Sequence, residues 1–263
     1  WIDADVEGAP LPPGLVSPEL RGKKALFLDG SLRPIDAEKP QPDEIEISLR
    51  MDPQGNSRGR FRAALRSRSG QRLAQALEDA TPGAARRALL EGVVHAWLPS
   101  AEISSVGRGG ARPGVAIVIE ATVSRFESAV PTSVNQVNVR EISGIWPLWS
   151  GYPTSVRSTL AQRFLRQGRP RRVNVPTSTL YRVTRTIELP ARAKMGSIPP
   201  RYAYDEGSLQ ARRATSVKGS ILVDEFFFGL ASGAMAPDDP NQLELDMRSI
   251  DAAFLRGVGI ELP

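Results

Sequence analysis

A strict alternation of apolar and polar side chains between residues 44 and 51 does most to limit how this chain can fold. Apolar residues occupy every second position, and polar residues stand between them: Ile45, Ile47, Leu49 and Met51 alternate with Glu44, Glu46, Ser48 and Arg50. Successive side chains of a strand point to opposite faces, so the pattern predicts a strand with one buried face. Residues 52–56 (DPQGN) are typical of a turn. We therefore expect residues 58–67 to return as the second arm of a hairpin.

Two helices are expected next. Residues 70–79 predict the first, because Leu73 and Leu77 are four residues apart and share one helical face. The second is expected to begin with Thr81 as its N-cap, since Pro82 is tolerated at the first helical position. Apolar residues then repeat every four positions, as an amphipathic helix requires: Leu89, Val93 and Trp97.

Most of the remaining chain predicts strands. Besides a short strand at residues 24–29, they are expected at 101–106, 115–126, 134–142, 172–175, 180–189, 208–217 and 219–228. Residues 115–119 are apolar without a break, which predicts a central strand buried on both faces. A last helix is expected from residue 238 and should end at Gly257 and Gly259. Its apolar residues share one face: Leu243, Met247, Ile250 and Phe254.

This order of elements predicts an α+β fold with a mainly antiparallel β-sheet or sandwich, two central helices and a C-terminal helix. We expect three parts. Residues 1–22 are rich in Pro and Gly and form a linker. Residues 23–130 form a β-rich subdomain with a helical insert, and residues 131–263 form a second β-rich subdomain with the C-terminal helix. The boundary falls in a Ser/Thr/Pro segment at Pro131.

The absence of cysteine excludes disulfides, thiolate metal sites and a thiol nucleophile from these 263 residues. His95 is the single histidine, so imidazoles alone cannot build a zinc site, and we expect neither metal nor cofactor. We expect His95 to cap a helix or to be partly buried. No apolar run approaches the roughly 18 residues that a membrane-spanning helix needs.

The net charge is +5, and almost all of the basic residues are arginines. One interpretation is a basic module that binds an anionic polymer, either nucleic acid or an acidic polysaccharide. The basic residues are spread along the chain, which favours solvated strand faces over a nucleic-acid surface. The glycine-rich segment at residues 107–114 has the composition of a phosphate-binding loop. It leads into a predicted strand and not into a helix, so we interpret it as a flexible connection.

Two acids and an aromatic loop are further candidates. Asp224 and Glu225 interrupt an apolar strand, so one of them should point to the core and require a cationic partner. The nearby candidates are Arg182, Arg185, Arg212 and Arg213. An acid catalyst is the alternative role for either carboxylate.

A Pro/Gly-rich segment carries three aromatic residues, Trp146, Trp149 and Tyr152. They suit a stacking platform for peptide or sugar, although a loop that plugs the end of a sandwich has the same composition.

The first thirty residues carry a resemblance to a known family. They contain Trp1-Ile2-Asp3, a Gly/Pro-rich stretch at residues 8–13 and the basic-to-apolar segment 20–28. This arrangement resembles the end of the transglutaminase-like core in large bacterial exported proteins, where Trp-x-Asp closes the catalytic domain and a linker leads into a β-rich region. The strand-like segment that ends at Leu189-Pro190 is similar to one in such regions.

The resemblance implies a non-catalytic accessory region, periplasmic or extracellular, that supports an upstream transglutaminase-like catalytic domain or binds a peptide or cell-envelope polymer. That upstream domain would be a cysteine acyltransferase or protease. Asp3 would take the role of the acid that orients the catalytic histidine, with the Cys and His on the upstream segment. Asp5 competes with Asp3 for this position. By itself the chain is expected to catalyse no reaction.

Overall fold

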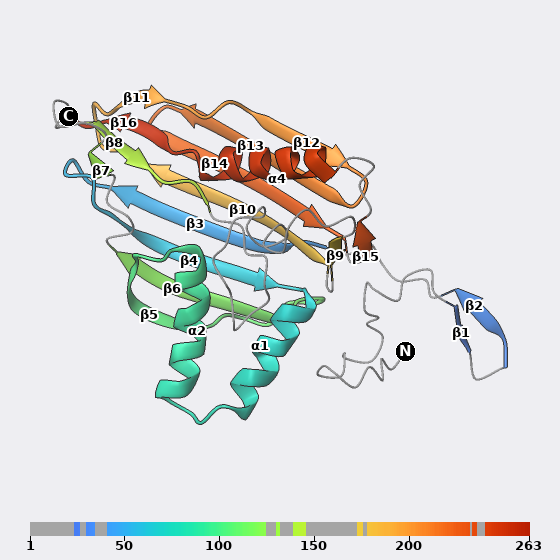
Figure 1. Cartoon of the computed structure of the whole chain (residues 1–263). Helices are drawn as coiled ribbons and strands as arrows, with labels where there is room; N and C mark the ends of the chain where they lie inside the picture. Colours follow the sequence, from blue (N-terminus) through green and yellow to red (C-terminus); the bar gives the residue numbers. More distant parts are fainter. Residues whose placement is uncertain are drawn as a thin grey trace.

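The computed structural model describes residues 24–26, 30–34, 41–124, 130–131, 139–145, 173–175, 178–231, 233–235 and 240–263. An eight-stranded sheet lies at its centre (Figure 1). Its strands, from one edge to the other, are β12 (Tyr202–Glu206), β13 (Leu209–Lys218), β14 (Ile221–Leu230), β10 (Thr179–Glu188), β3 (Asp43–Met51), β4 (Ser57–Leu65), β6 (Ile117–Ser124) and β5 (Glu102–Arg108). Neighbours are antiparallel except β10 and β3, which run parallel. The sheet therefore takes strands from both sides of Pro131.

Smaller sheets and three described helices complete the fold. A four-stranded sheet has the order β11 (Lys194–Ser197), β16 (Val258–Glu261), β8 (Val139–Ile142) and β7 (Val130–Pro131). Two-stranded pairs join β1 (Lys24–Leu26) to β2 (Leu32–Pro34), and β15 (Gly233–Met235) to β9 (Val173–Val175). The helices are α1 (Arg68–Asp79), α2 (Ala84–Trp97) and α4 (Pro240–Leu255). The expected α+β fold with a mainly antiparallel sheet and a C-terminal helix is confirmed.

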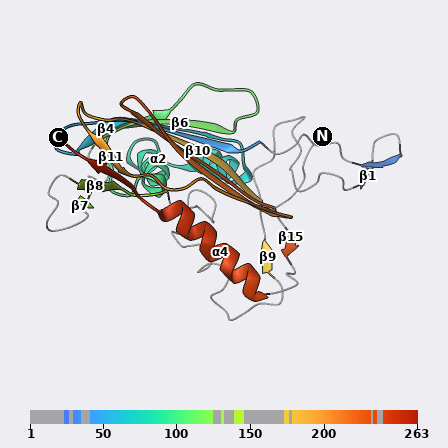
Figure 2. The same cartoon turned by 90° about the horizontal axis from the view of Figure 1, so that it is seen from above.

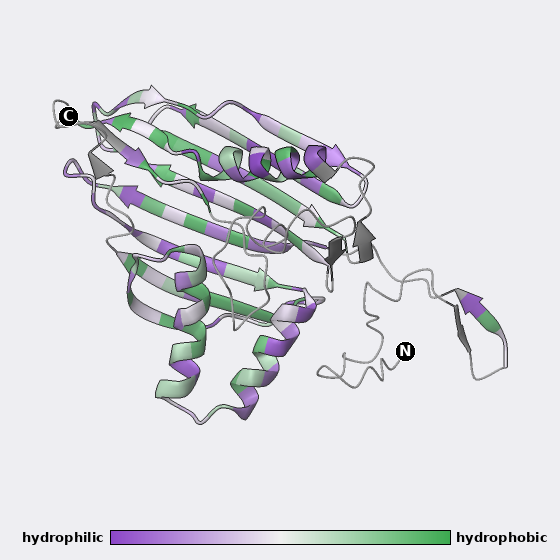
Figure 3. Cartoon of the chain, in the orientation of Figure 1, coloured by the Kyte–Doolittle hydropathy of each residue, from purple (hydrophilic) through white to green (hydrophobic). Residues whose placement is uncertain are grey.

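The described helices cover one face of the large sheet, and no described helix lies on the other, which is called the open face below (Figure 2). The alternation along β3 is confirmed, because its apolar side chains are buried and all but one of the intervening polar side chains are exposed. Figure 3 shows the same alternation of hydropathy along the strands. On the covered face, Trp97 of α2 packs edge-on against Tyr181 of β10, with ring centroids 5.2 Å apart. Burial of these aromatic and branched side chains supplies the main driving force for folding.

Helix α4 covers the same face at the other side of the sheet. Its predicted apolar face is confirmed, since Leu243, Met247, Ile250 and Phe254 are all buried. The Phe254 ring lies 5.4 Å from the Phe226 ring of β14 in an edge-on arrangement. None of the described helices combines the length and apolar character needed to cross a lipid bilayer.

The start of α1 is fixed by a buried carboxylate. Asp43 accepts hydrogen bonds from the Arg66 and Ser67 backbone N–H groups at 2.6 and 2.8 Å, and from the Ser67 hydroxyl at 2.7 Å. Ser67 in turn is the N-cap of α1 and accepts from the Gly70 N–H. Burial raises the pKa of Asp43, while the hydrogen bonds from Ser67 and Arg66 act in the opposite direction. The contact ties the beginning of β3 to the helix.

Two predictions from the sequence were wrong in detail. Helix α2 begins at Ala84 with Gly83 as its N-cap, not at Thr81, because Gly83 adopts a positive φ of 93° that is incompatible with a helix already under way. Strand β6 is not central, since only β5 lies outside it. Its outward-facing Val118 is nevertheless buried, because Gly109 of the β5–β6 connection lies against it. The apolar run at residues 115–119 is therefore explained by this local contact, and it does not require a central position in the sheet.

Candidate functional site

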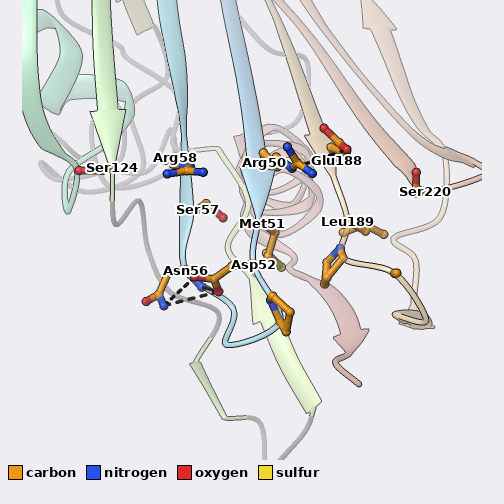
Figure 4. Close-up of a pocket in the computed structure, with 13 residues that line it drawn as sticks. Arg50, Met51, Asp52, Asn56, Ser57, Arg58, Ser124, Glu188, Leu189 and Ser220 are labelled. Atoms are coloured by element: carbon orange, nitrogen blue, oxygen red, sulfur yellow. Dashed lines mark hydrogen bonds and ion pairs between the residues drawn. The ribbon is translucent and has the colours of Figure 1, made fainter.

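A cleft of about 840 Å³ lies at one end of the eight-stranded sheet (Figure 4). Its described lining comes from residues 50–53, 56–58, 124, 188–191 and 220. Sheet register explains why these segments meet: Ser124, Arg58, Arg50, Glu188 and Ile221 are paired in one row across β6, β4, β3, β10 and β14. The turns beyond this row form the walls of the cleft.

The β3–β4 turn makes one wall, and hydrogen bonds to Asp52 stabilise it. The Oδ1 atom of Asp52 accepts from the backbone N–H groups of Gln54 and Asn56 at 2.9 and 2.8 Å, and the Asn56 amide donates to Oδ2 at 3.1 Å. Gly55 completes the turn with a φ of 87°. Desolvation opposes ionisation of Asp52, but the hydrogen bonds from Asn56, Gln54 and Gly55 outweigh it and hold the pKa of Asp52 below its ordinary value. The predicted turn is confirmed.

Both described carboxylates of the cleft, Asp52 and Glu188, have polar partners within the fold. General acid–base catalysis works best when the pKa of the group lies near the working pH, and the pKa of Asp52 is shifted away from it. Glu188 forms an ion pair with Arg50 at 3.7 Å. The rest of the lining combines serine hydroxyls with apolar surface from Met51, Leu189 and Pro190. Such a mixture of apolar area and a few fixed polar groups is typical of a recognition site.

Asp224 occupies a different place, sealed between the sheet and α4. It accepts from Arg185 Nη2 at 2.7 Å, from Arg213 Nη2 and Nε at 2.9 and 3.1 Å, and from the Thr215 hydroxyl at 2.8 Å. The side chains of Asp224 and both arginines have no exposed surface. The predicted structural ion pair is therefore confirmed, and a carboxylate with no access to solvent cannot act on a substrate. Glu225 lies on the open face and is exposed.

The two arginines of this cluster also join separate layers of the fold. Arg213 Nη1 donates to the carbonyls of Ala253 at 2.7 Å and Arg256 at 2.6 Å, at the C-terminal end of α4. A positive charge is favourable there because the last carbonyls of a helix carry partial negative charge. Arg185 Nη1 donates to the Ser143 carbonyl, just after β8, at 2.6 Å. The cluster is therefore a structural junction of the two sheets and α4.

Several candidates from the sequence lie outside the described residues, namely Asp3, Trp146, Trp149 and Tyr152. His95 lies in the last turn of α2, a position compatible with the expected capping role, and it is exposed, so the alternative expectation of partial burial was wrong. Of the glycine-rich segment, residues 109–114 lie in the connection between β5 and β6 as expected, whereas Gly107 and Arg108 belong to β5. Within the described ranges, no three His, Asp or Glu side chains gather in a way that could hold a metal ion.

The cleft was not recognised from the sequence, which identified residues 52–56 only as a turn. Its walls come from segments far apart in the chain, and β3 meets β10 through a parallel pairing that no local pattern specifies. The chain matches no family model, no curated protein and no solved structure.

Proposed function

We propose that this chain is a non-catalytic binding region that recognises a peptide or protein partner in the end cleft. One observation carries the proposal: a hydrogen-bonded turn forms one wall of the cleft, and both of its described carboxylates have partners within the fold. A rigid wall lowers the entropic cost of ordering the site on binding. Apolar surface beside fixed polar groups suits a peptide, whose backbone and side chains offer both kinds of contact.

We further propose that the binding region is the accessory C-terminal part of a transglutaminase-like protein, located in the periplasm or outside the cell. The support is the resemblance of the first thirty residues, and Asp3 keeps its proposed role only if a Cys and a His lie upstream. Reading the coding sequence immediately before Trp1 tests this. A Cys and a strand containing a His there would support the accessory role, and their absence would contradict it.

The alternative function is a basic module for an anionic polymer, and the net charge of +5 favours it. The open sheet face disfavours it, because acids alternate with the arginines: Glu46, Glu120, Glu188 and Glu225 all lie there. The affinity for a polymer bound through several phosphate or sulfate contacts would fall steeply as the salt concentration rises. Retention on heparin or DNA with such a salt slope would therefore support the alternative.

Filling part of the cleft should weaken partner binding. A random peptide library displayed on phage serves as the probe, and we expect the wild-type chain to select binders from it. Ala191 lines the cleft and is exposed, so Ala191→Trp should obstruct it without disturbing the core and should weaken the selected peptides at least about tenfold. Ala252→Trp, on the exposed side of α4, is the matched control and should leave affinity unchanged. Equal binding to both variants, or failure to select any peptide, would contradict the proposal.

A further inference from the structure

Three arginines occupy adjacent positions on the open face of the sheet, and two of them, Arg50 and Arg58, line the cleft. Arg50 of β3 is directly opposite Arg58 of β4 in the register, and Arg60 follows on the same face of β4. Side chains paired in this way have Cβ atoms about 4.5–5.5 Å apart, and residues two apart in a strand are separated by roughly 6.5 Å. All three side chains are exposed, and Figure 4 shows Arg50 and Arg58 on neighbouring strands at the cleft. Three positively charged side chains thus start from adjacent positions on two neighbouring strands.

This arrangement is unfavourable without a ligand, because like charges directly opposite each other destabilise a sheet. The next arginine along β4 has two acidic partners: Arg62 forms ion pairs with Glu46 at 3.3 Å and with Glu120 at 3.5 Å. Arg50 has one carboxylate, that of Glu188, at 3.7 Å. Across the described part of the chain, Arg58 and Arg60 form no ion pair with an acidic side chain. Two guanidinium groups therefore remain available to an anion from outside.

The neighbours of these arginines are small and carry hydroxyl groups. Ser124 is paired with Arg58, while Ser48 and Thr122 are paired with Arg60 on its two sides. Serine and threonine leave the guanidinium groups accessible and can donate hydrogen bonds to the same anion. Ser124, Arg50 and Arg58 also line the cleft, so the arginines and the cleft form one continuous surface.

We propose that Arg50, Arg58 and Arg60 form a carboxylate-binding site for an acidic residue of the peptide that occupies the cleft. This rests on the proposed binding function and specifies its ligand. A guanidinium presents paired N–H donors that match the two oxygens of a carboxylate. The apolar side chains of Met51 and Leu189 in the adjoining cleft suit an apolar residue next to the acidic one.

The limited size of the patch favours a peptide over a long polyanion. Glu46 and Glu120 border it beyond Arg60, and Glu188 borders it beside Arg50. These acids would repel the successive charges of a nucleic acid or sulfated polysaccharide laid across the sheet. Of the three arginines, only Arg58 and Arg60 are without an acidic partner among the described residues, which suits one or two ligand carboxylates.

The test uses the peptides selected from the random phage library. We expect them to be enriched in Asp or Glu next to an apolar residue, and to bind the Arg58→Gln/Arg60→Gln double variant at least about tenfold more weakly. Arg182→Gln is the matched control, since Arg182 is an exposed arginine on the same sheet face but at the opposite end of β10 from the cleft, and it should bind as the wild type does. Replacing the acidic residue of the peptide by its amide should reproduce the loss on the wild-type chain.

The outcomes separate this inference from the proposed function. Peptides without acidic enrichment that still lose affinity for Ala191→Trp would overturn the carboxylate site and leave the binding cleft intact. Equal affinity for the double variant and for Arg182→Gln would also overturn the carboxylate site. Tight binding of heparin with a steep salt slope, lost in the double variant, would replace the acidic peptide with a polyanion. Failure to select any peptide would overturn both proposals.

Discussion

Replacing Asp224 with alanine should lower the free energy of unfolding by about 3–5 kcal/mol. The substitution leaves Arg185 and Arg213 buried with no anion between them, and both guanidinium groups have no exposed surface. Removing one member of a buried ion pair strands the charge of the other, whose desolvation is then uncompensated. Arg213 would keep its hydrogen bonds to the carbonyls at the end of α4, but these partial charges do not replace a carboxylate.

Equilibrium unfolding in urea measures this loss, and Glu225→Ala is the matched control. Glu225 is the next residue in β14 but is exposed on the opposite face, so its removal should change stability by no more than about 0.5 kcal/mol. Replacing Asp224, Arg185 and Arg213 together with apolar residues should cost less than Asp224→Ala alone, because no charge is then stranded. Similar small losses for Asp224→Ala and Glu225→Ala would show that the cluster does not act as a structural junction.

Phe254→Ala should destabilise the protein by about 3–5 kcal/mol as well, for a different reason. Phe254 is fully buried, and its ring packs edge-on against Phe226 at 5.4 Å and Phe228 at 6.5 Å. Truncation removes apolar surface and leaves a cavity between α4 and the sheet, which the rigid strands cannot close.

Leu245→Ala is the control for this prediction, since Leu245 lies on the same helix but is 60% exposed. Its loss should stay within about 0.5 kcal/mol. If both variants unfold at the same urea concentration, α4 is not anchored through Phe254 and the described packing of the C-terminal helix is wrong.

Local periodicity was sufficient to predict the strands and helices in which buried residues recur at a regular spacing. The alternation from Ile45 to Met51 gave one buried strand face, and the spacing of Leu243, Met247, Ile250 and Phe254 gave the buried face of α4. The β13–β14 hairpin was also anticipated, although its turn is formed by Gly219 and Ser220. In each case the interaction partners are close in sequence or share one face of a single element.

Pairing between distant segments could not be predicted in this way. Four arginines were candidates for Asp224, and only Arg185 and Arg213 point to the covered face, because strand alternation sends Arg182 and Arg212 to the open one. The choice depends on the register of β10 and β13 against β14, which the sequence alone leaves open. The arginine pair at Arg50 and Arg58 follows from the hairpin register, but its position beside a cleft depends on β10.

The central claim is that this chain recognises a partner without transforming it. The most direct test is to assay the isolated chain for turnover. A panel of peptide, amide and ester substrates, including the selected acidic peptides, would be incubated with the chain and followed by mass spectrometry. We predict saturable binding of the acidic peptides and no hydrolysis or acyl transfer. Turnover that disappears in His95→Ala, the variant that removes the single histidine, would contradict the account.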